Sequence, residues 1–169
     1  MREPTQEELL KIVEYRDGKL FWRDGRKGRG LYRLGRAGST KPNSAGTLRI
    51  NITINGVARS YLQHRIIYIY HYGKCPQYLD HINRDRLDNR IENLRPATRS
   101  QNNYNAGLRR DNTSGIKGIC WHSRSRKWYA SVMVAGKSVC LGCFSILEEA
   151  AAAVVAARAE LHGEYACHG

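Results

Sequence analysis

The alternation of apolar and polar residues predicts a β-hairpin in the middle of the N-terminal half. Residues 48–54 alternate with the period of two that is typical of a strand, and Asn55-Gly56 supplies a type I′ turn. A return strand is expected over 57–61, followed by a helix over about 62–72 that ends at Gly73. The pattern therefore indicates a hairpin that leads directly into a helix.

A helix, a short strand and a basic loop are expected before this hairpin. A helix over 5–14 begins with Thr5 and Glu8, the two polar residues of a capping box. A short strand follows over 20–22. Residues 24–46 are rich in glycine and arginine and poor in apolar side chains, so we expect a basic loop.

Two short strands and a helix are predicted over residues 78–104. The strands cover 79–82 and 94–97 and are separated by an asparagine-rich loop. Thr98 and Gln101 form a capping box, so a helix begins there with Asn102 in its first turns.

The C-terminal third has a separate pattern, a sheet followed by a helix. Three strands are expected, over 116–121, 127–135 and 137–144. Ser145 and Glu148 indicate a capping box that opens an alanine-rich helix, and this helix ends at Gly163. Small alanine side chains allow a helix to lie close to a three-stranded sheet.

Positive charge dominates the composition. The chain has 28 lysine and arginine residues against 15 aspartates and glutamates, a formal net charge of +13 and a pI of about 9.9. Such a balance favours a nucleic-acid partner and leaves DNA and RNA both open. The charge is unevenly distributed along the chain. Residues 16–49 are strongly basic, whereas the charged residues of 146–165 are mostly glutamates.

The composition argues against membranes and secretion. No apolar run approaches the roughly eighteen residues of a membrane span, and residues 1–5 show no apolar signal segment. The five cysteines are odd in number, which a reducing compartment explains better than a disulfide framework. We therefore expect a cytoplasmic protein with no membrane partner.

Candidate catalytic groups gather in the 78–104 segment. Asp80 stands beside His81, and Asn93 and Asn102 follow at nine-residue spacing. A carboxylate can hold a divalent metal and an imidazole can take a proton from water, which together suit phosphodiester hydrolysis. Adjacent strand residues point to opposite faces, so Asp80 and His81 need a local bend or a strand end to share one site.

Asp80-His81, Asn93-Leu94 and Asn102 resemble the motif of the HNH endonucleases, the ββα-metal (His-Me finger) nucleases of phage and intron-encoded homing enzymes. The resemblance implies that Asp80 and Asn102 are metal ligands, that His81 is the general base and that Asn93 braces the loop orienting it. A His64-Arg65 pair precedes the motif, as in this subfamily, and receives no catalytic role. Asn102 replaces the histidine of many members. An amide oxygen is a harder metal ligand than the imidazole nitrogen it replaces. We therefore expect one Mg²⁺ or Mn²⁺ ion rather than zinc.

Residues 114–165 resemble the APETALA/ethylene-response-factor (ERF) type of DNA-binding domain through Ser114-Gly115-Ile116-Lys117-Gly118-Ile119, Lys127-Trp128-Tyr129-Ala130, Leu141-Gly142-Cys143-Phe144, Glu148-Glu149-Ala150-Ala151 and Leu161-His162-Gly163-Glu164. The resemblance implies a sheet that enters the major groove with the helix behind it.

The candidate DNA contacts of the whole chain are Arg26, Lys27, Arg29, Arg33, Arg36, Arg95, Arg99, Lys117, Trp121, Arg124, Arg126, Trp128 and Lys137. The two tryptophans have an alternative role as core aromatics, because the alternation of residues 128–134 also suits the face under the helix. Cys140 and Cys143 form a C-x-x-C that lacks a second close ligand pair, so zinc is not expected and the thiols should fill small buried sites.

Together these features predict an α+β protein with an N-terminal β-hairpin and helix region, a ββα-metal nuclease core, and a three-stranded antiparallel sheet packed on one helix. The expected domains are 1–47 (helix and basic loop), 48–105 (nuclease), 106–113 (linker) and 114–169 (DNA binding). The expected function is metal-dependent, sequence-directed cleavage of double-stranded DNA in the cytoplasm of a bacterial or phage-infected cell. A monomer is favoured, and no small-molecule cofactor is expected. The alternatives are an inactive DNA-binding regulator on a nuclease scaffold and an RNA-binding structural protein.

Overall fold

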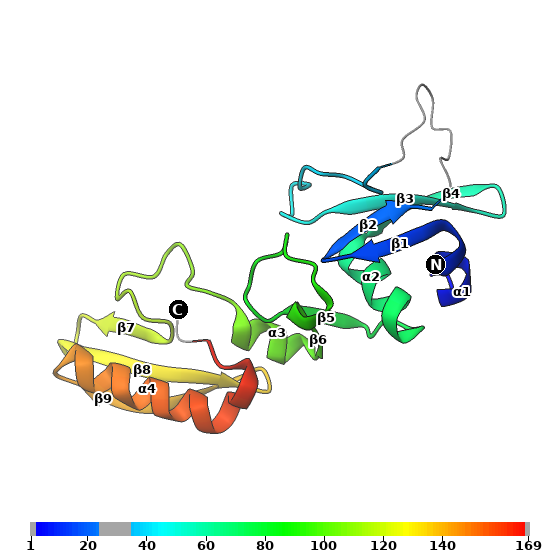
Figure 1. Cartoon of the computed structure of the whole chain (residues 1–169). Helices are drawn as coiled ribbons and strands as arrows, with labels where there is room; N and C mark the ends of the chain where they lie inside the picture. The colour runs from blue at the N-terminus through cyan, green and yellow to red at the C-terminus, as the bar shows by residue number, and fades with distance from the viewer. Residues whose placement is uncertain (1–2, 24–34, 168–169) are drawn as a thin grey trace. The chain divides into compact units, whose positions relative to one another are not determined.

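The computed structural model describes residues 3–23 and 35–167 (Figure 1). The chain divides into two compact units, Met1–Pro96 and Ala97–Gly169, each with a hydrophobic core of its own. The division falls inside the predicted 48–105 nuclease domain, immediately before the helix that carries Asn102. The four-part domain division stays a prediction.

The first unit opens with a short helix, α1 (Gln6–Ile12), and the predicted Thr5 and Glu8 capping box is confirmed. The helix is shorter than predicted, because Val13 has extended backbone and begins strand β1 (Val13–Arg16). Val13 is fully buried in the core of the unit, so an extended strand buries it where another helical turn was expected.

Strand β1 pairs antiparallel with β2 (Lys19–Trp22), a hairpin that the sequence analysis missed. Its turn residues Asp17 and Gly18 have φ values of 43° and 74°, the left-handed backbone that type I′ turns require. The Asp-Gly pair was the available signal for this turn.

The predicted hairpin and helix of the first unit are confirmed. β3 (Arg49–Ile54) pairs antiparallel with β4 (Val57–Leu62) across Asn55-Gly56, whose φ values are 50° and 78°. Helix α2 (Gln63–Tyr72) follows directly and ends at Gly73 in left-handed conformation, with φ 78°.

The core of the first unit forms where α1 and α2 meet the two hairpins. Its buried residues are Leu9, Ile12, Val13, Leu20, Ala37, Ile50, Ile52, Ile66, Ile67, Ile69 and Leu94. Ile50 and Ile52 come from alternate positions of β3, as the period-two pattern predicted.

The motif segment lies at the end of this unit. Strand β5 (Tyr78–His81) pairs with β6 (Leu94–Ala97), and the one-turn 3₁₀ helix η1 (Ile91–Asn93) immediately precedes β6. Leu94 is buried in the core, so β6 anchors this small sheet to the rest of the unit.

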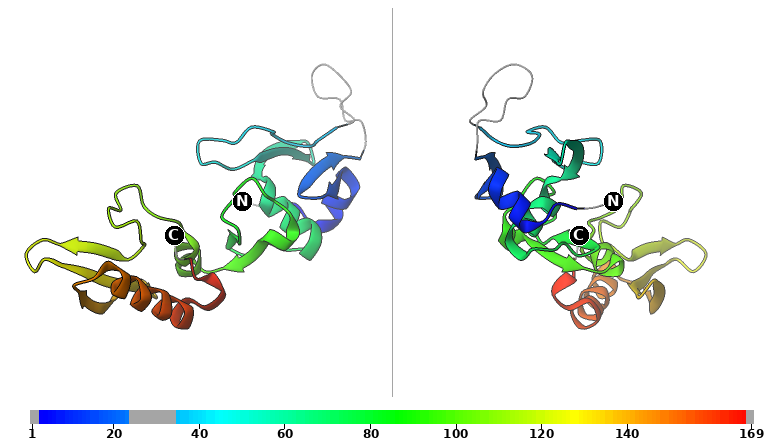
Figure 2. Two further views of the ribbon diagram at one scale, coloured as in Figure 1. Left: turned by 60° about the vertical axis from the view of Figure 1, so that its left-hand side comes forward. Right: turned by 90° about the vertical axis from the view of Figure 1, so that its right-hand side faces the viewer.

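The second unit begins with α3 (Arg99–Asn105), and its predicted Thr98 and Gln101 capping box is confirmed. Three antiparallel strands follow in the order β7-β8-β9, with bounds Ile119–His122, Lys127–Val134 and Lys137–Phe144. Helix α4 (Leu147–His162) lies across one face of this sheet (Figures 1 and 2). The one-turn 3₁₀ helix η2 (Gly163–Tyr165) follows α4 directly.

The predicted capping box at Ser145 is wrong. The N-cap of α4 is Ile146, and no side chain makes a capping hydrogen bond there. Glu148 and Glu149 lie in the first turn, where their charges interact favourably with the helix dipole. The acidic residues therefore stabilise this helix start in place of a hydroxyl cap.

The sheet and α4 enclose a compact core made by Ile119, Ala130, Val132, Ala150 and Val154. Trp128 packs against this cluster and shares its side of the sheet with Trp121, its cross-strand partner. The two rings meet edge to face at 4.9 Å. Trp128, Ala130, Val132 and Val134 therefore form the face under the helix, the alternative that the alternation had left open.

The prediction that the thiols fill small buried sites is wrong for most of them. Cys120, Cys140 and Cys143 are exposed, and Cys167 is buried. Cys120 and Cys143 flank Tyr129 on the two neighbouring strands, on the face turned away from α4. A register shift between Ala130 and Ser131 brings Cys140 to the same face, because it adds one residue to β9.

Within the described chain, no helix has both the length and the apolar character that a membrane crossing requires.

Candidate active site

The two central residues of the motif, Asp80 and His81, lie at the end of β5 and are both buried, with 7% and 8% of their surface exposed. Buried polar side chains need hydrogen-bond partners, and these two have different ones. Each residue therefore has a side-chain partner of its own, Arg95 for Asp80 and Asn89 for His81.

Asp80 is held by an arginine of the neighbouring strand. Arg95 on β6 donates from Nε to Asp80 Oδ2 at 2.9 Å, and its Nη2 lies 2.8 Å from the same oxygen. The two side chains are only 12% and 8% exposed, so this is a buried ion pair. Arg95 was predicted to contact DNA, but its guanidinium is bonded to the candidate metal ligand.

His81 is held by an asparagine from the loop. Its Nε2 lies 3.1 Å from Oδ1 of Asn89, a residue that is 1% exposed. An amide oxygen only accepts hydrogen bonds, so His81 Nε2 carries the proton of the neutral ring and donates it. In this tautomer Nδ1 has the lone pair.

The ring of His64 packs edge to face against His81, with 5.2 Å between ring centroids and 79° between planes. Burial, and to a smaller extent electrostatic repulsion from His81, together lower the pKa of His64 to about 3. His64 is therefore neutral at physiological pH and gives His81 an uncharged wall.

Arg65 ties the start of β5 in place. It donates to Glu3 Oε1 at 2.9 Å and to the backbone oxygens of Pro76 and Gln77 at 3.0 and 3.2 Å. His64 and Arg65 received no catalytic role from the sequence, and each has a structural one. His64 packs against the His81 imidazole, and Arg65 holds the segment that leads into β5.

Asn93 braces the loop between β5 and η1. Its Oδ1 accepts from the Asn83 backbone N–H at 2.9 Å, while its Nδ2 donates to Asn83 Oδ1 and to the Asp88 carbonyl. Arg90 hydrogen bonds to the Asp88 carboxylate and thereby lowers the pKa of Asp88 to about 2. This geometry agrees with the bracing role expected for Asn93, whose importance for catalysis stays a prediction.

The β1–β2 hairpin supports the same loop from outside the motif. Tyr15 Oη accepts from the Ile91 backbone N–H at 3.1 Å. At Gly18, an added Cβ would lie 2.9 Å from the backbone nitrogen of Arg90 and 3.1 Å from the carbonyl carbon of Asn89. The hairpin turn therefore packs directly against the backbone that positions Asn89.

Asn102, the other candidate metal ligand, lies on α3 in the second unit. This helix is anchored to the C-terminal sheet. The Tyr104 ring stacks on His162 at 3.8 Å and 5°, and Tyr104 Oη accepts from the Ala135 backbone N–H at 2.8 Å. Lys117 donates to the carbonyl of Tyr104 at 2.8 Å.

Lys117 was expected to contact DNA, and the structure instead places its ammonium group at the C-terminal end of α3. It also donates to the carbonyl of Asn103 there, at 3.1 Å. These carbonyls belong to the last turn of the helix, where, among the described residues, only that of Asn103 accepts a backbone hydrogen bond, from the Ala106 N–H at 3.3 Å. A cation at this end supplies a further donor and interacts well with the helix dipole. The helix that carries Asn102 is thus joined to the rest of the second unit through Tyr104 and Lys117.

The other candidate DNA contacts differ in placement. Arg26, Lys27, Arg29 and Arg33 lie outside the described residues. Arg36 is half-buried beside β2, with its backbone bridged to Phe21. Exposed side chains belong to Arg99, Trp121, Arg124, Arg126 and Lys137. Trp128 is half-buried against the core, which favours a packing role for it.

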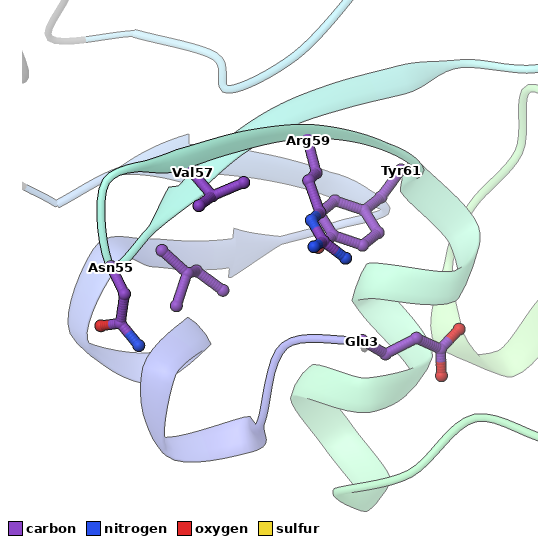
Figure 3. A pocket seen from close by; sticks show the side chains of 6 residues that line it. Glu3, Asn55, Val57, Arg59 and Tyr61 are labelled. Atoms are coloured by element: carbon purple, nitrogen blue, oxygen red, sulfur yellow. The ribbon is translucent and has the colours of Figure 1, made fainter. Parts of the chain in front are cut away.

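A shallow pocket of about 180 Å³ lies apart from these residues, beside the β3–β4 hairpin (Figure 3). Val57, Arg59 and Tyr61 reach it from alternate positions of β4, and Asn55 lies at the turn. None of the motif residues lines this pocket, so it plays no part in the candidate site.

The donor set at the motif suits a hard cation. In the described part of the chain, no cluster of three or more histidine, cysteine, aspartate or glutamate side chains is arranged to hold a metal. The expected ligands are one carboxylate and one amide, two oxygen donors of the kind that Mg²⁺ and Mn²⁺ prefer. Such a pair leaves most coordination positions for water and phosphate oxygens.

Comparison with known proteins agrees with the motif. Residues 61–104 match the protein family described as HNH endonuclease, a range that runs from β4 to α3. Protein 3.8 of Escherichia phage T7 is 35% identical over 96 residues, which cover 56% of this chain and 78% of that protein. The chain belongs to the family of Protein 3.8. No solved structure matches it.

The part of this chain that matches the HNH endonuclease family contains all four motif residues, Asp80, His81, Asn93 and Asn102. Strands β7 to β9 and α4 lie beyond the matched range, so the ERF-type resemblance stays a prediction. So does the ββα-metal arrangement of the nuclease core.

The sequence analysis missed several residues that support the site. Asn89 received no role in the sequence analysis, and only the folded loop brings it to His81. Tyr15 and Gly18 lie more than sixty residues before the motif, on the hairpin that was not predicted. The Asp17-Gly18 turn signal could have revealed the hairpin but not its contact with the loop.

Proposed function

We propose that this chain is a metal-dependent, sequence-directed DNA endonuclease of the HNH type that hydrolyses phosphodiester bonds. The observation that carries the proposal is the pairing of His81 with Asn89 beside a buried Asp80. A buried imidazole with one nitrogen fixed by an acceptor is prepared to take a proton at the other nitrogen.

In the proposed mechanism, His81 Nδ1 removes a proton from the attacking water. Asn89 holds the ring in the required tautomer and stabilises the imidazolium that forms, because its amide oxygen continues to accept from Nε2. Neutral His64 restricts the rotation of the ring without adding a competing positive charge. Asn93 keeps the loop in the shape that presents Asn89.

Asp80 and Asn102 would hold one Mg²⁺ or Mn²⁺, which neutralises charge on the phosphate and on the leaving 3′ oxygen when bound. Arg95 fixes the Asp80 carboxylate in one orientation through two contacts to a single oxygen. It also offsets the cost of burying that negative charge before a cation is bound.

DNA attraction follows from the formal net charge of +13 and from the exposed cations of the C-terminal sheet. Arg124 and Arg126 lie in the β7–β8 turn and Lys137 opens β9. A DNA-reading sheet of the ERF type would supply sequence direction. The links from Tyr104 and Lys117 connect that sheet to the helix bearing Asn102.

Incubation of supercoiled plasmid with the protein and Mg²⁺ or Mn²⁺ tests the proposal. We expect nicked or linear product, and no product in EDTA. A gel shift without product in either metal would support the second candidate, a DNA-binding regulator on a nuclease scaffold. The occupation of the Asp80 carboxylate by Arg95 is the observation that favours this candidate. Duplex RNA that outcompetes duplex DNA would contradict both.

A further inference from the structure

A hollow of about 480 Å³ lies on the outer face of the β3–β4 hairpin in the first unit. Its lining residues are Trp22, Gly38, Ser39, Arg49, Asn51 and Ser60. Asn51 and Ser60 are cross-strand partners, and Arg49 lies two positions before Asn51, so these side chains share one face of the hairpin. All three are exposed, whereas Ile50 and Ile52 are buried on the opposite face. The hollow is therefore a solvent-facing surface that the core does not use.

The backbone around this hollow is fixed by hydrogen bonds between the two hairpins. The Ala37 N–H donates to the Leu20 carbonyl of β2 at 2.6 Å, and the Ser39 N–H donates to the Arg49 carbonyl of β3 at 2.7 Å. Gln63, which is fully buried, donates from Nε2 to the carbonyls of Ser39 and Arg49 at 3.0 and 3.1 Å. The lining is thus held in place by the fold itself.

Arg49 is the cation of this surface. Its Nε donates to Ser60 Oγ at 2.8 Å, and its Nη2 donates to the Ser60 carbonyl at 3.0 Å. Both acceptors are uncharged, and among the described residues no carboxylate forms an ion pair with Arg49. A guanidinium has five N–H donors, so these two bonds orient the group and leave other donors for a ligand.

The chemistry of the surroundings favours an anion. No aspartate or glutamate lines the hollow, and the sequence has none between residues 25 and 79. Guanidinium, amide, hydroxyl and indole groups, which all occur in the lining, are typical donors to the phosphates of DNA. An anion on this face therefore meets one oriented cation and several neutral donors.

A phosphate within a DNA strand fits this surface better than a free phosphate. One exposed arginine binds a small anion weakly, whereas a polyanion adds this contact to others along the chain. The loop that leads into β3 also touches the motif loop, because Arg86 Nη1 donates to the Ala45 carbonyl at 3.0 Å. The hairpin and the motif are thus connected within one unit.

We propose that this hollow holds a backbone phosphate of duplex DNA, with Arg49 on the phosphate, Asn51 as a second donor and Trp22 beside the sugar. The inference rests on the proposed function only for the identity of its partner. A phosphate contact carries no base information, so it should raise the affinity for every sequence alike.

Binding of the full chain to a fluorescein-labelled duplex of arbitrary sequence, measured in EDTA over a range of salt concentrations, tests the contact without cleavage. Arg49→Gln should weaken binding about threefold to tenfold at low salt. It should also make the slope of log affinity against log salt shallower by about 0.9, the share of one phosphate contact.

Arg59→Gln is the matched control, because it removes the same charge from an exposed position of the same hairpin. Arg59 pairs with the buried Ile52 and lines the separate pocket on the other face (Figure 3). This variant should stay within about twofold of the parent affinity and keep its salt slope.

A second pair of variants adds charge to the hairpin. Asn51→Asp places a carboxylate beside Arg49 and should weaken binding by about tenfold or more. Asn55→Asp makes the same change at the turn, where aspartate accepts the left-handed backbone, and outside the hollow. It should stay within about twofold of the parent affinity. Thermal unfolding of each variant in the same buffer checks that the fold is retained.

Equal losses of affinity in Arg49→Gln and Arg59→Gln, or an unchanged salt slope in Arg49→Gln, would overturn the proposal. So would a parent chain that does not bind duplex DNA. A greater loss of affinity for duplex RNA than for duplex DNA in Arg49→Gln would assign the hollow to RNA instead. Saturable binding of thymidine 5′-monophosphate that this variant abolishes, with DNA affinity unchanged, would assign it to a free nucleotide.

Plasmid nicking in Mg²⁺ or Mn²⁺ with the same proteins separates this inference from the proposed function. A parent chain that binds DNA through Arg49 but gives no product keeps the contact and contradicts the cleavage. A parent chain that cuts, with both arginine variants binding alike, keeps the cleavage and contradicts the contact.

Discussion

At the scale of single residues, β5 presents two adjacent buried side chains to two separate sets of partners. Asp80 meets a cation from β6, while His81 meets a neutral amide and a neutral imidazole. The charge of Asp80 is thereby compensated by Arg95, whereas the contacts of His81 with Asn89 and His64 are with uncharged groups.

Asn89→Leu should slow DNA cleavage by about tenfold to a hundredfold, because His81 loses the acceptor that fixes its tautomer while the volume at the site is kept. Single-turnover nicking of plasmid measures the effect, with DNA affinity determined in parallel. Unchanged cleavage at equal affinity would remove Asn89 from the mechanism.

Arg95→Met should lower the free energy of unfolding by about 3 kcal/mol, because it leaves Asp80 buried without its counter-charge. Urea unfolding measures the change. Arg99→Met is the matched control at an exposed neighbour and should stay within about 0.5 kcal/mol of the parent chain. The double variant Asp80→Leu with Arg95→Met should recover much of the loss, since the whole ion pair is then replaced by apolar groups. A stable Arg95→Met variant would show that the pair contributes little.

The sequence pointed to the motif residues because their spacing is local and ordered, but it could not predict their partners. Arg95 is one of many arginines in a basic chain, and only the β5–β6 pairing brings it to Asp80. Lys117 similarly looked like a DNA contact, and its role at the end of α3 depends on a fold that joins distant segments. Long-range contacts of this kind leave no periodic signal.

At the scale of elements, the hairpin β1–β2 contributes to the motif from the far end of the chain. Its turn packs on the backbone at Asn89 and Arg90, and Tyr15 accepts a hydrogen bond from the N–H of Ile91. The loop that orients His81 is therefore supported from outside as well as by Asn93.

Gly18→Ala should reduce cleavage several-fold and destabilise the first unit, because the new Cβ would lie 2.9 Å from the Arg90 nitrogen at a φ of +74°. Gly56→Ala is the matched control, since its φ is +78° and an added Cβ meets nothing within 4 Å. Thermal unfolding and plasmid nicking of both variants separate backbone strain from contact with the loop. Equal effects of the two substitutions would mean that the contact at Gly18 has no role.

Element prediction succeeded where a local signal was sufficient. The capping boxes at Thr5 and Thr98 and the turn at Asn55-Gly56 were confirmed, because each depends on residues within a few positions. The Ser145 capping box failed although the residue types were right, since α4 begins one residue later than that box requires. Competing helix starts one residue apart cannot be separated without the packing of the helix on its sheet.

At the scale of the whole molecule, the chain combines two units that each hold histidines with lowered pKa values. Burial lowers the pKa of His64 and His71 in the first unit and of His162 in the second. A histidine whose folded pKa is lowered binds fewer protons than in the unfolded chain, so its stabilising effect is present at neutral pH and is lost on acidification.

Stability should accordingly fall as the pH drops below about 6.5, the unfolded pKa, with the loss from His64 continuing toward its folded pKa of about 3. Between pH 7 and pH 5, His64 should account for about 1 to 2 kcal/mol of the free energy of unfolding. Urea unfolding of the parent chain and of His64→Phe at both pH values tests this, and the variant should show the smaller pH dependence. The same pH dependence in both proteins would contradict the burial of a neutral His64.

Cleavage of supercoiled plasmid by His81→Ala in Mg²⁺ or Mn²⁺, set beside the parent chain and His122→Ala, tests the central claim most directly. His122 is an exposed histidine of β7, so its loss should leave the rate unchanged. We predict that His81→Ala removes cleavage while DNA affinity stays within a few-fold of the parent value. Cleavage by His81→Ala at the parent rate would contradict the account, because the proton would then leave the attacking water by another route.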